Sequence, residues 1–256
     1  MKWSFERKIG ILVGLFFCAI AGLVFVPPIP QWSKYHNLAD SRRWLEVPHF
    51  GNVMSNAGFV AAGLYGLARI FRDGLFDNSP DRVPYIVFFA GAALVGLGSG
   101  YYHWAPSNER LFWDRLPMTI AFMSFFAAVI ADRIHRRVGL VWLLPILLFA
   151  GAFSLIYWQR TEAAGAGDLR FYGMVQFFPL AAIPVIFWLF RDYRYTEGKP
   201  LLLAIGWYVG SKIMEHFDLL LLGLSGGTVS GHSLKHMAAA VAVFWVLRML
   251  NDAQNS

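Results

Sequence analysis

The sequence predicts an all-α protein, a polytopic bundle of membrane-spanning helices. Of its 256 residues, 57% are hydrophobic and 15% are charged, whereas an average soluble domain carries about 25% charged residues. A soluble fold of this size would leave too much of that apolar surface in water, because a large share of its chain stays exposed. The apolar residues also form runs that match the bilayer, which a helix crosses in about 20 residues.

Eight apolar runs have this length. Prolines mark several of their ends: Pro27 and Pro28 follow the first run, Pro84 precedes the third and Pro200 opens the seventh. No separate soluble domain fits between the runs. We expect helices at 9–28, 50–71, 84–104, 111–132, 139–158, 169–190, 200–222 and 231–249.

The first run has two interpretations. Lys2, Arg7 and Lys8 precede it, as basic residues precede the apolar part of a secretory signal peptide. However, the run is nearly long enough to span the bilayer, and Val26-Pro27-Pro28 makes a poor cleavage site. We favour an uncleaved membrane helix, and cleavage stays the alternative.

The positive residues between the runs predict an orientation. If the helices alternate in direction, the segments on the side of the termini hold thirteen Lys and Arg, and those on the other side hold seven. Cytoplasmic loops carry the excess of such residues. Both termini are therefore expected to be cytoplasmic. This distribution accounts for the net charge of +6 without nucleic acid as a partner.

Ionisable residues inside membrane spans are costly and point to function. Ser99 and His103 lie four residues apart at the end of the third run and share one helix face. Asp114 opens the fourth run, and His232 and His236, again four apart, open the eighth. Because successive helices run in opposite directions, all five residues belong to the same, non-cytoplasmic end of the bundle.

Three histidines with one open position are typical of a catalytic zinc site, so His103, His232 and His236 are the expected metal ligands. Bound zinc activates water and polarises a carbonyl group. Asp114 would then act as general base and later as general acid. Ser99 would orient the water or bind the developing oxyanion. Haem held by two histidines is the competing interpretation, and each histidine alone could be an ordinary hydrogen-bonded residue.

Further polar residues lie on the second and seventh runs. We expect those of the second run to make hydrogen bonds between helices, and those of the seventh to form ion pairs along one helix. Lys235 is expected to pair with an acid elsewhere in the bundle. The residues are Asn52, Ser55 and Asn56 on the second run, and Lys212, Glu215, His216 and Asp218, in the pairs Lys212–His216 and Glu215–Asp218, on the seventh.

These residues form motifs that resemble the alkaline ceramidase family, part of a superfamily of seven-helix membrane hydrolases and adiponectin-type receptors. The resemblance extends over about 49–250. It implies a seven-helix core behind one extra N-terminal transmembrane helix, with parts at 1–30, 31–49 (an interfacial segment) and 50–250. The matching motifs are Ser99-x-x-x-His103, Asp114-Arg115-Leu116-Pro117-Met118, His232-x-x-x-His236, and Phe50 with Asn52, Ser55 and Asn56.

The resemblance implies a zinc-dependent intramembrane amidohydrolase. Its substrate would be ceramide or a related N-acyl lipid, cleaved at the amide to a sphingoid base and a fatty acid. By the same resemblance the three histidines bind zinc, Asp114 acts on the zinc-bound water and Ser99 assists at the oxyanion. A receptor-like or lipid-binding membrane protein of this superfamily, without turnover, is the alternative.

The sequence departs from the family pattern where the family binds calcium. That site uses acidic residues ahead of the first core helix and ends in a glutamate, whose position is taken here by His49. Asp40 and Glu46 are nearby acids at a different spacing. We therefore assign Asp40, Glu46 and His49 either to a calcium site or to a cap that covers the helices.

Overall fold

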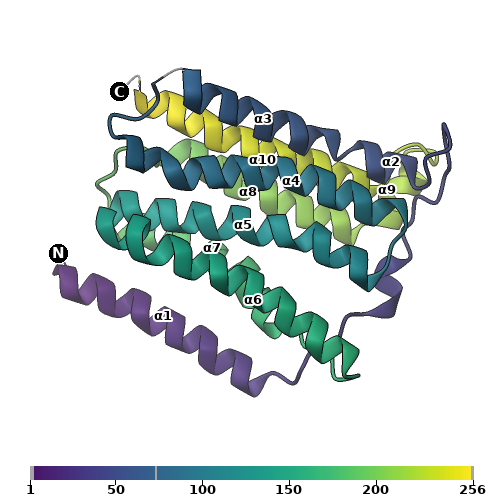
Figure 1. Cartoon of the computed structure of the whole chain (residues 1–256), viewed down its shortest axis with the longest axis horizontal. Coiled ribbons are helices and arrows are strands. Elements are labelled where there is room, and N and C mark those ends of the chain that lie inside the picture. Colours follow the sequence, from purple (N-terminus) through teal and green to yellow (C-terminus); the bar gives the residue numbers. More distant parts are fainter. Residues whose placement is uncertain (1–2, 73, 255–256) are drawn as a thin grey trace.

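The structure is a computed structural model that describes residues 3–72 and 74–254, so Lys2 lies outside the described residues. Within this part of the chain, helices lie side by side with roughly parallel axes and no β-strand is present, only one isolated bridge between Trp44 and Val47 (Figure 1). Six of the described helices are long and apolar enough to cross a membrane. The predicted all-α polytopic bundle is therefore confirmed.

The described chain passes eight times along the bundle. The loops at 26–49, 105–107, 164–169 and 217–230 lie at one end, which we call the capped end. The loops at 74–82, 134–137 and 190–197 lie, with the two ends of the described chain, at the other end, which we call the terminal end (Figure 1). The passes are α1 (Phe5–Phe25), α2 with α3 (Phe50–Met54, Ala57–Arg72), α4 (Val83–Trp104), α5 (Asn108–Arg133), the π-helical η3 with α6 (Val138–Leu143, Leu144–Ala163), α7 (Arg170–Leu189), α8 with α9 (Gly198–His216, Asp218–Leu224) and α10 (Gly231–Gln254).

The predictions of two continuous helices, the second at 50–71 and the seventh at 200–222, were wrong, because each is broken in the structure. The ends of the other six differ from the prediction by up to five residues. The second breaks after α2, where the side chains of Ser55 and Asn56 donate hydrogen bonds to the Asn52 carbonyl (3.1 and 2.8 Å). Such side-chain bonds compete with the helical ladder. The seventh breaks at Phe217, and Asp218 turns to accept the backbone N–H of His232 at 2.7 Å.

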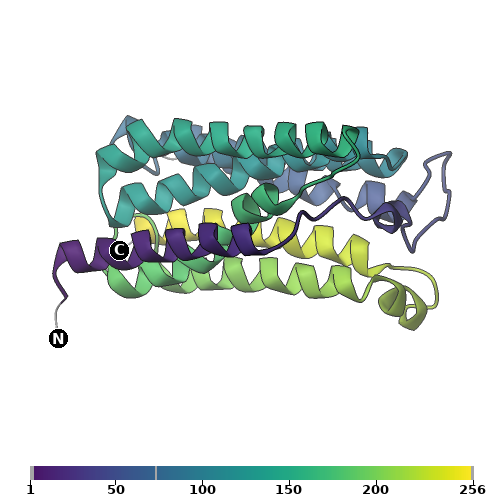
Figure 2. The same ribbon diagram turned by 90° about the horizontal axis from the view of Figure 1, so that it is seen from below.

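α1 lies at the edge of the bundle, beside α7 (Figures 1 and 2). None of its residues is buried. Its contacts with α7 include the edge-on pair of Phe16 with Phe178 and a hydrogen bond from Arg170 to the Leu23 carbonyl (3.0 Å). Trp3, just before the helix, packs edge-on against Trp188. A helix this apolar and this exposed is suited to contact with lipid on most of its surface.

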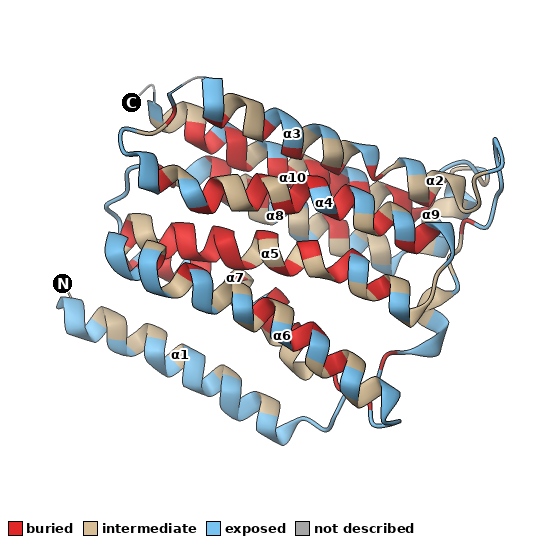
Figure 3. Cartoon of the chain, viewed as in Figure 1, coloured by how far each residue is buried: buried red, intermediate tan, exposed pale blue. Residues whose placement is uncertain are grey.

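Buried residues concentrate on α4, α5 and α10 (Figure 3). Close packing of α4 on α5 depends on Gly98, because a Cβ atom there would collide with the Trp113 carbonyl group. Glycine permits such a close approach of two backbones. As a result, Ser99 of α4 and Asp114 of α5 meet at the capped end.

Candidate metal centre and lipid pocket

Three buried histidines converge at the capped end. His103 comes from the last turn of α4, and His232 and His236 come from the first turns of α10. The Nε2 atoms of His103 and His232 are 3.1 Å apart. All three residues offer nitrogen atoms within 4.8 Å of one another, and within the described ranges no other group of three His, Cys, Asp or Glu meets this condition.

The donor set fits a metal ion. In tetrahedral zinc sites, Zn–N bonds of about 2.0–2.1 Å place neighbouring nitrogens roughly 3.3 Å apart, close to the spacing between His103 and His232. Nδ1 of His236 lies 2.8 Å from Oγ of Ser55, an outer hydrogen bond of the kind that orients ligating histidines. By contrast, Nδ1 of His103 is buried without a hydrogen-bond partner.

Asp114 and Ser99 lie beside the histidines. Both side chains are buried, Ser99 at 3% and Asp114 at 8% exposure. Together with His236 they line one cavity. The structure thus brings together all five residues that the motifs singled out, although their chemical roles follow only from the proposal below.

A charged cluster adjoins the same place. Glu215 of α8 accepts hydrogen bonds from Lys212 (2.9 Å) and from Lys235 of α10 (2.6 Å). The prediction that Lys235 pairs with an acid is confirmed. The predicted pairs Lys212–His216 and Glu215–Asp218 are wrong, because Glu215 points toward α10 and Asp218 caps that helix.

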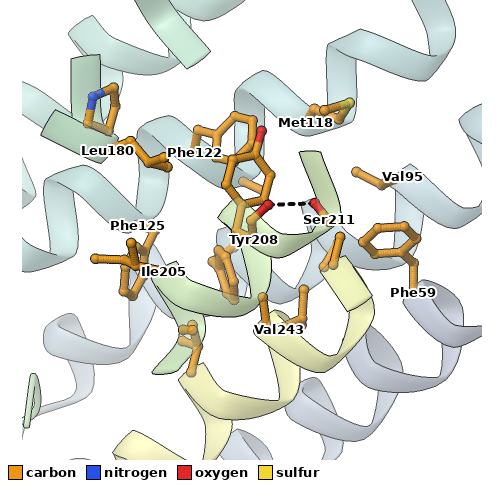
Figure 4. A pocket seen from close by; sticks show the side chains of 18 of the residues that line it. Phe59, Val95, Met118, Phe122, Phe125, Leu180, Ile205, Tyr208, Ser211 and Val243 are labelled. Atoms are coloured by element: carbon orange, nitrogen blue, oxygen red, sulfur yellow. Dashed lines mark hydrogen bonds between the residues drawn. The ribbon is translucent and has the colours of Figure 1, made fainter. Parts of the chain in front are cut away.

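An apolar pocket extends from this polar end into the bundle (Figure 4). Its walls come from α3, α4, α5, α7, α8 and α10, and they include Phe122, Tyr208 and Val243. On α4 the lining runs from Ser99 to Phe88, eleven residues or about 16 Å of helix. Hydropathy did not reveal this pocket, because a side chain that faces an apolar cavity resembles one that faces lipid.

The segment before α2 caps the site. Asp40 is buried, and both of its oxygens accept hydrogen bonds from Arg42 at 2.7 Å. Burial would raise the pKa of Asp40, but the bonds from Arg42 outweigh this effect and hold the pKa below its ordinary value. Arg42 also donates to the carbonyl of Thr228, in the loop before α10 (2.7 Å).

Glu46 and His49, which the sequence assigned with Asp40 to a calcium site or a cap, do not gather with Asp40 around one point. His49 Nδ1 lies 2.9 Å from the Asp40 carbonyl oxygen, whereas Glu46 is exposed and lies 3.5 Å from Arg43. The carboxylate of Asp40 is already paired with Arg42. Asp40 and His49 therefore lie together in the capping segment, Glu46 lies apart from them, and these three residues form no cluster that would hold calcium.

The fold and the three converging histidines define a helical membrane protein with a candidate metal centre. The model of the ceramidase family matches residues 46–194, more than half of the chain, and the protein belongs to this family. No curated protein matches the chain. The matched residues include Ser99, His103 and Asp114 but end before His232 and His236, which their motif and their position in the fold connect with the site.

Proposed function

We propose that the protein is a zinc-dependent intramembrane amidohydrolase that cleaves the amide of ceramide or a related N-acyl lipid. One observation carries the proposal: Ser99, Asp114 and His236 form the polar end of a long apolar pocket, directly beside the histidine cluster. A lipid with its amide at that end and its acyl chain in the pocket would place the scissile bond next to an acid and a metal site. Membership of the ceramidase family supports this substrate class.

The residues of the site have distinct roles in this proposal. His103, His232 and His236 hold zinc, which when bound polarises the amide carbonyl and activates water. Asp114 takes the proton of the attacking water and delivers it to the leaving amine. Ser99 orients the attacking water or binds the developing oxyanion. The apolar walls exclude bulk water, which strengthens the electrostatic interactions inside.

The proposal includes an orientation. The site lies at the capped end, opposite both chain ends. The excess of Lys and Arg in the segments of the terminal end favours a cytoplasmic position for that end. The site would then face the non-cytoplasmic side of the membrane, where a lipid of the outer leaflet can reach it.

The test combines metal analysis of purified protein with mass spectrometry of lipids after incubation with ceramide. We expect the unaltered protein to contain zinc and to release fatty acid, and His232→Ala to lose both. His135→Ala, in a loop of the terminal end, is the matched control and should retain both. Full amide cleavage by a zinc-free His232→Ala protein would overturn the proposal, and so would retention of intact ceramide without cleavage by the unaltered protein.

A further inference from the structure

Lys235 is a charged residue that contacts the histidine cluster. The motifs give it no role. We propose that its ammonium group is a further catalytic group, which binds the carbonyl oxygen as this becomes an oxyanion and then binds the carboxylate of the fatty acid product. The inference rests on the proposed function and adds a residue to it.

The position of Lys235 places its ammonium group at the reaction centre. Lys235 lies on α10 between His232 and His236, and its side chain is only 14% exposed. Its Nζ atom is 3.2 Å from Nε2 of His232, a contact that bound zinc would replace because it uses the same nitrogen lone pair. It lines the pocket together with Ser99 and Asp114. A lipid carbonyl held between Asp114 and the histidines would thus be within reach of the Lys235 ammonium.

Glu215 keeps this ammonium group charged and fixed in place. A buried ammonium group is costly without a partner, and the Glu215 carboxylate lies 2.6 Å from Nζ of Lys235. Glu215 itself does not line the pocket, whereas Lys235 and Lys212 do. The Glu215 carboxylate therefore stabilises the Lys235 ammonium from the side away from the pocket, and the ammonium remains the group that lines the cavity.

A cation in this pocket is better suited to the charges that form during the reaction than to the uncharged substrate. A neutral amide lipid carries no formal charge that would call for an ammonium group at the polar end of this pocket. Negative charge arises on the carbonyl oxygen only during the reaction, and on the carboxylate at its end. Interactions made only with the developing charge accelerate the reaction, whereas equal binding of the substrate does not. A preorganised donor in an apolar site is well suited to this task.

The reaction balances without a further reactant. The water oxygen bonds to the carbonyl carbon, its proton passes to Asp114, and the electron pair of the C=O bond moves to the oxygen beside Lys235. The C=O bond then re-forms as the electron pair on the oxygen returns to the carbon, and the C–N bond breaks. The amine leaves with the proton from Asp114. The fatty acid so formed gives its remaining proton to Asp114, which releases it to water. Lys235 keeps its own protons throughout and ends beside the fatty acid carboxylate.

Kinetics of four variants test the assignment, with the zinc content of each measured alongside. Lys235→Met should lower kcat for ceramide about 100-fold, the usual cost of one oxyanion donor, and keep its zinc. Lys235→Arg should recover about tenfold of that loss, because it restores a charged donor. Lys212→Met also removes a partner of Glu215 but should lower kcat less than tenfold. Lys199→Met, at an exposed position near the start of α8, is the control for replacing a lysine by methionine.

Binding of a fatty acid provides a readout that does not depend on turnover. The unaltered protein should bind laurate about tenfold more tightly than the alcohol of equal chain length, since a hydrogen bond to a charged group contributes about 1.5–3 kcal/mol. Lys235→Met should remove this preference and leave binding of the alcohol unchanged.

Three results would overturn the proposal. They are a kcat of Lys235→Met within threefold of the unaltered protein, equal losses in Lys212→Met and Lys235→Met, and an unchanged preference for laurate in Lys235→Met. A protein that prefers laurate through Lys235 but cleaves no ceramide would contradict the proposed function and leave the anion site established.

Discussion

Buried charged groups occur at both ends of the bundle, but their partners differ. At the terminal end, Arg133 of α5 donates to the carbonyl of Phe190 and to the hydroxyl of Thr196, both at 2.8 Å. Its neighbour Asp132 accepts the backbone N–H of Thr196 at 2.9 Å. At the capped end, Lys235 instead pairs with the side chain of Glu215, and both Lys235 and Asp114 line the apolar pocket.

The difference separates charges that hold the fold from charges that are available for chemistry. Arg133 satisfies main-chain atoms of the loop between α7 and α8, which would otherwise be left without partners. The N–H groups of Arg133 therefore bond to other parts of the protein. Lys235 and Asp114 keep part of their hydrogen-bonding capacity for whatever enters the pocket. Burial of a charge alone does not distinguish a catalytic residue, whereas the partner of that charge and the adjoining cavity do.

Asp114→Asn at the capped end should give the largest effect. The amide keeps the size of the side chain but cannot accept a proton, so we expect kcat for ceramide to fall about 1,000-fold, within the range of lost general acid–base catalysis. Zinc content and the thermal midpoint should stay close to those of the unaltered protein. Retention of more than a tenth of the activity would show that Asp114 is not the general base.

Arg133→Met at the terminal end should have the opposite profile. It leaves the carbonyl groups of Phe190 and Thr196 and the Thr196 hydroxyl without their donor, so we expect a loss of about 3 kcal/mol in stability. Thermal unfolding in detergent micelles measures this loss, and activity per folded molecule should be unchanged. Arg137→Met, an exposed neighbour, should change stability by less than about 0.5 kcal/mol. A large loss of kcat in folded Arg133→Met would contradict the division between the two ends.

Val246→Phe tests the end of the pocket that lies farthest from Asp114. Val246 is buried and lines the pocket ten residues beyond His236 on α10. A larger side chain there should shorten the space for an acyl chain, so kcat/KM should fall about tenfold for the longest chains, as expected for one or two excluded methylene groups. Short-chain substrates should be affected less than threefold. Equal losses at every chain length would indicate general damage, and Phe244→Leu, on an exposed position of α10, provides the control.

Asp168→Asn, in the loop between α6 and α7, should give the smallest effect. Hydrogen bonds from Arg170 lower the pKa of Asp168 to about 2. Because this folded-state pKa lies below the ordinary value, the pair contributes stability above about pH 4 and loses it as the pH falls through 2. We expect a loss of about 2 kcal/mol at pH 7, the size of one charged hydrogen bond. The difference in thermal midpoint between the variant and the unaltered protein should shrink near pH 2 and stay constant between pH 5 and 8.

Much of the fold and the place of the site could be predicted because they depend on local features. The apolar runs have the length of the bilayer, and the spacing of His232 and His236 places them on one helix face. The breaks at Ser55 and Phe217 could not be predicted, because Asp218 leaves α8 to cap a helix that begins thirteen residues later. The pairing of Lys212 was wrong for a similar reason. Its partner Glu215 is shared with Lys235 of another helix.

By itself, the sequence determined that this chain forms membrane helices and that His103, His232 and His236 lie at the end opposite both termini. Span length and alternating direction suffice for that. Only the tertiary structure decided that these histidines meet, that Lys235 turns toward them and that a pocket lies beneath them. The physical reason is that lipid and the interior of a membrane protein are similarly apolar. Hydropathy therefore separates membrane from water, but it does not tell which face of a helix lines the pocket.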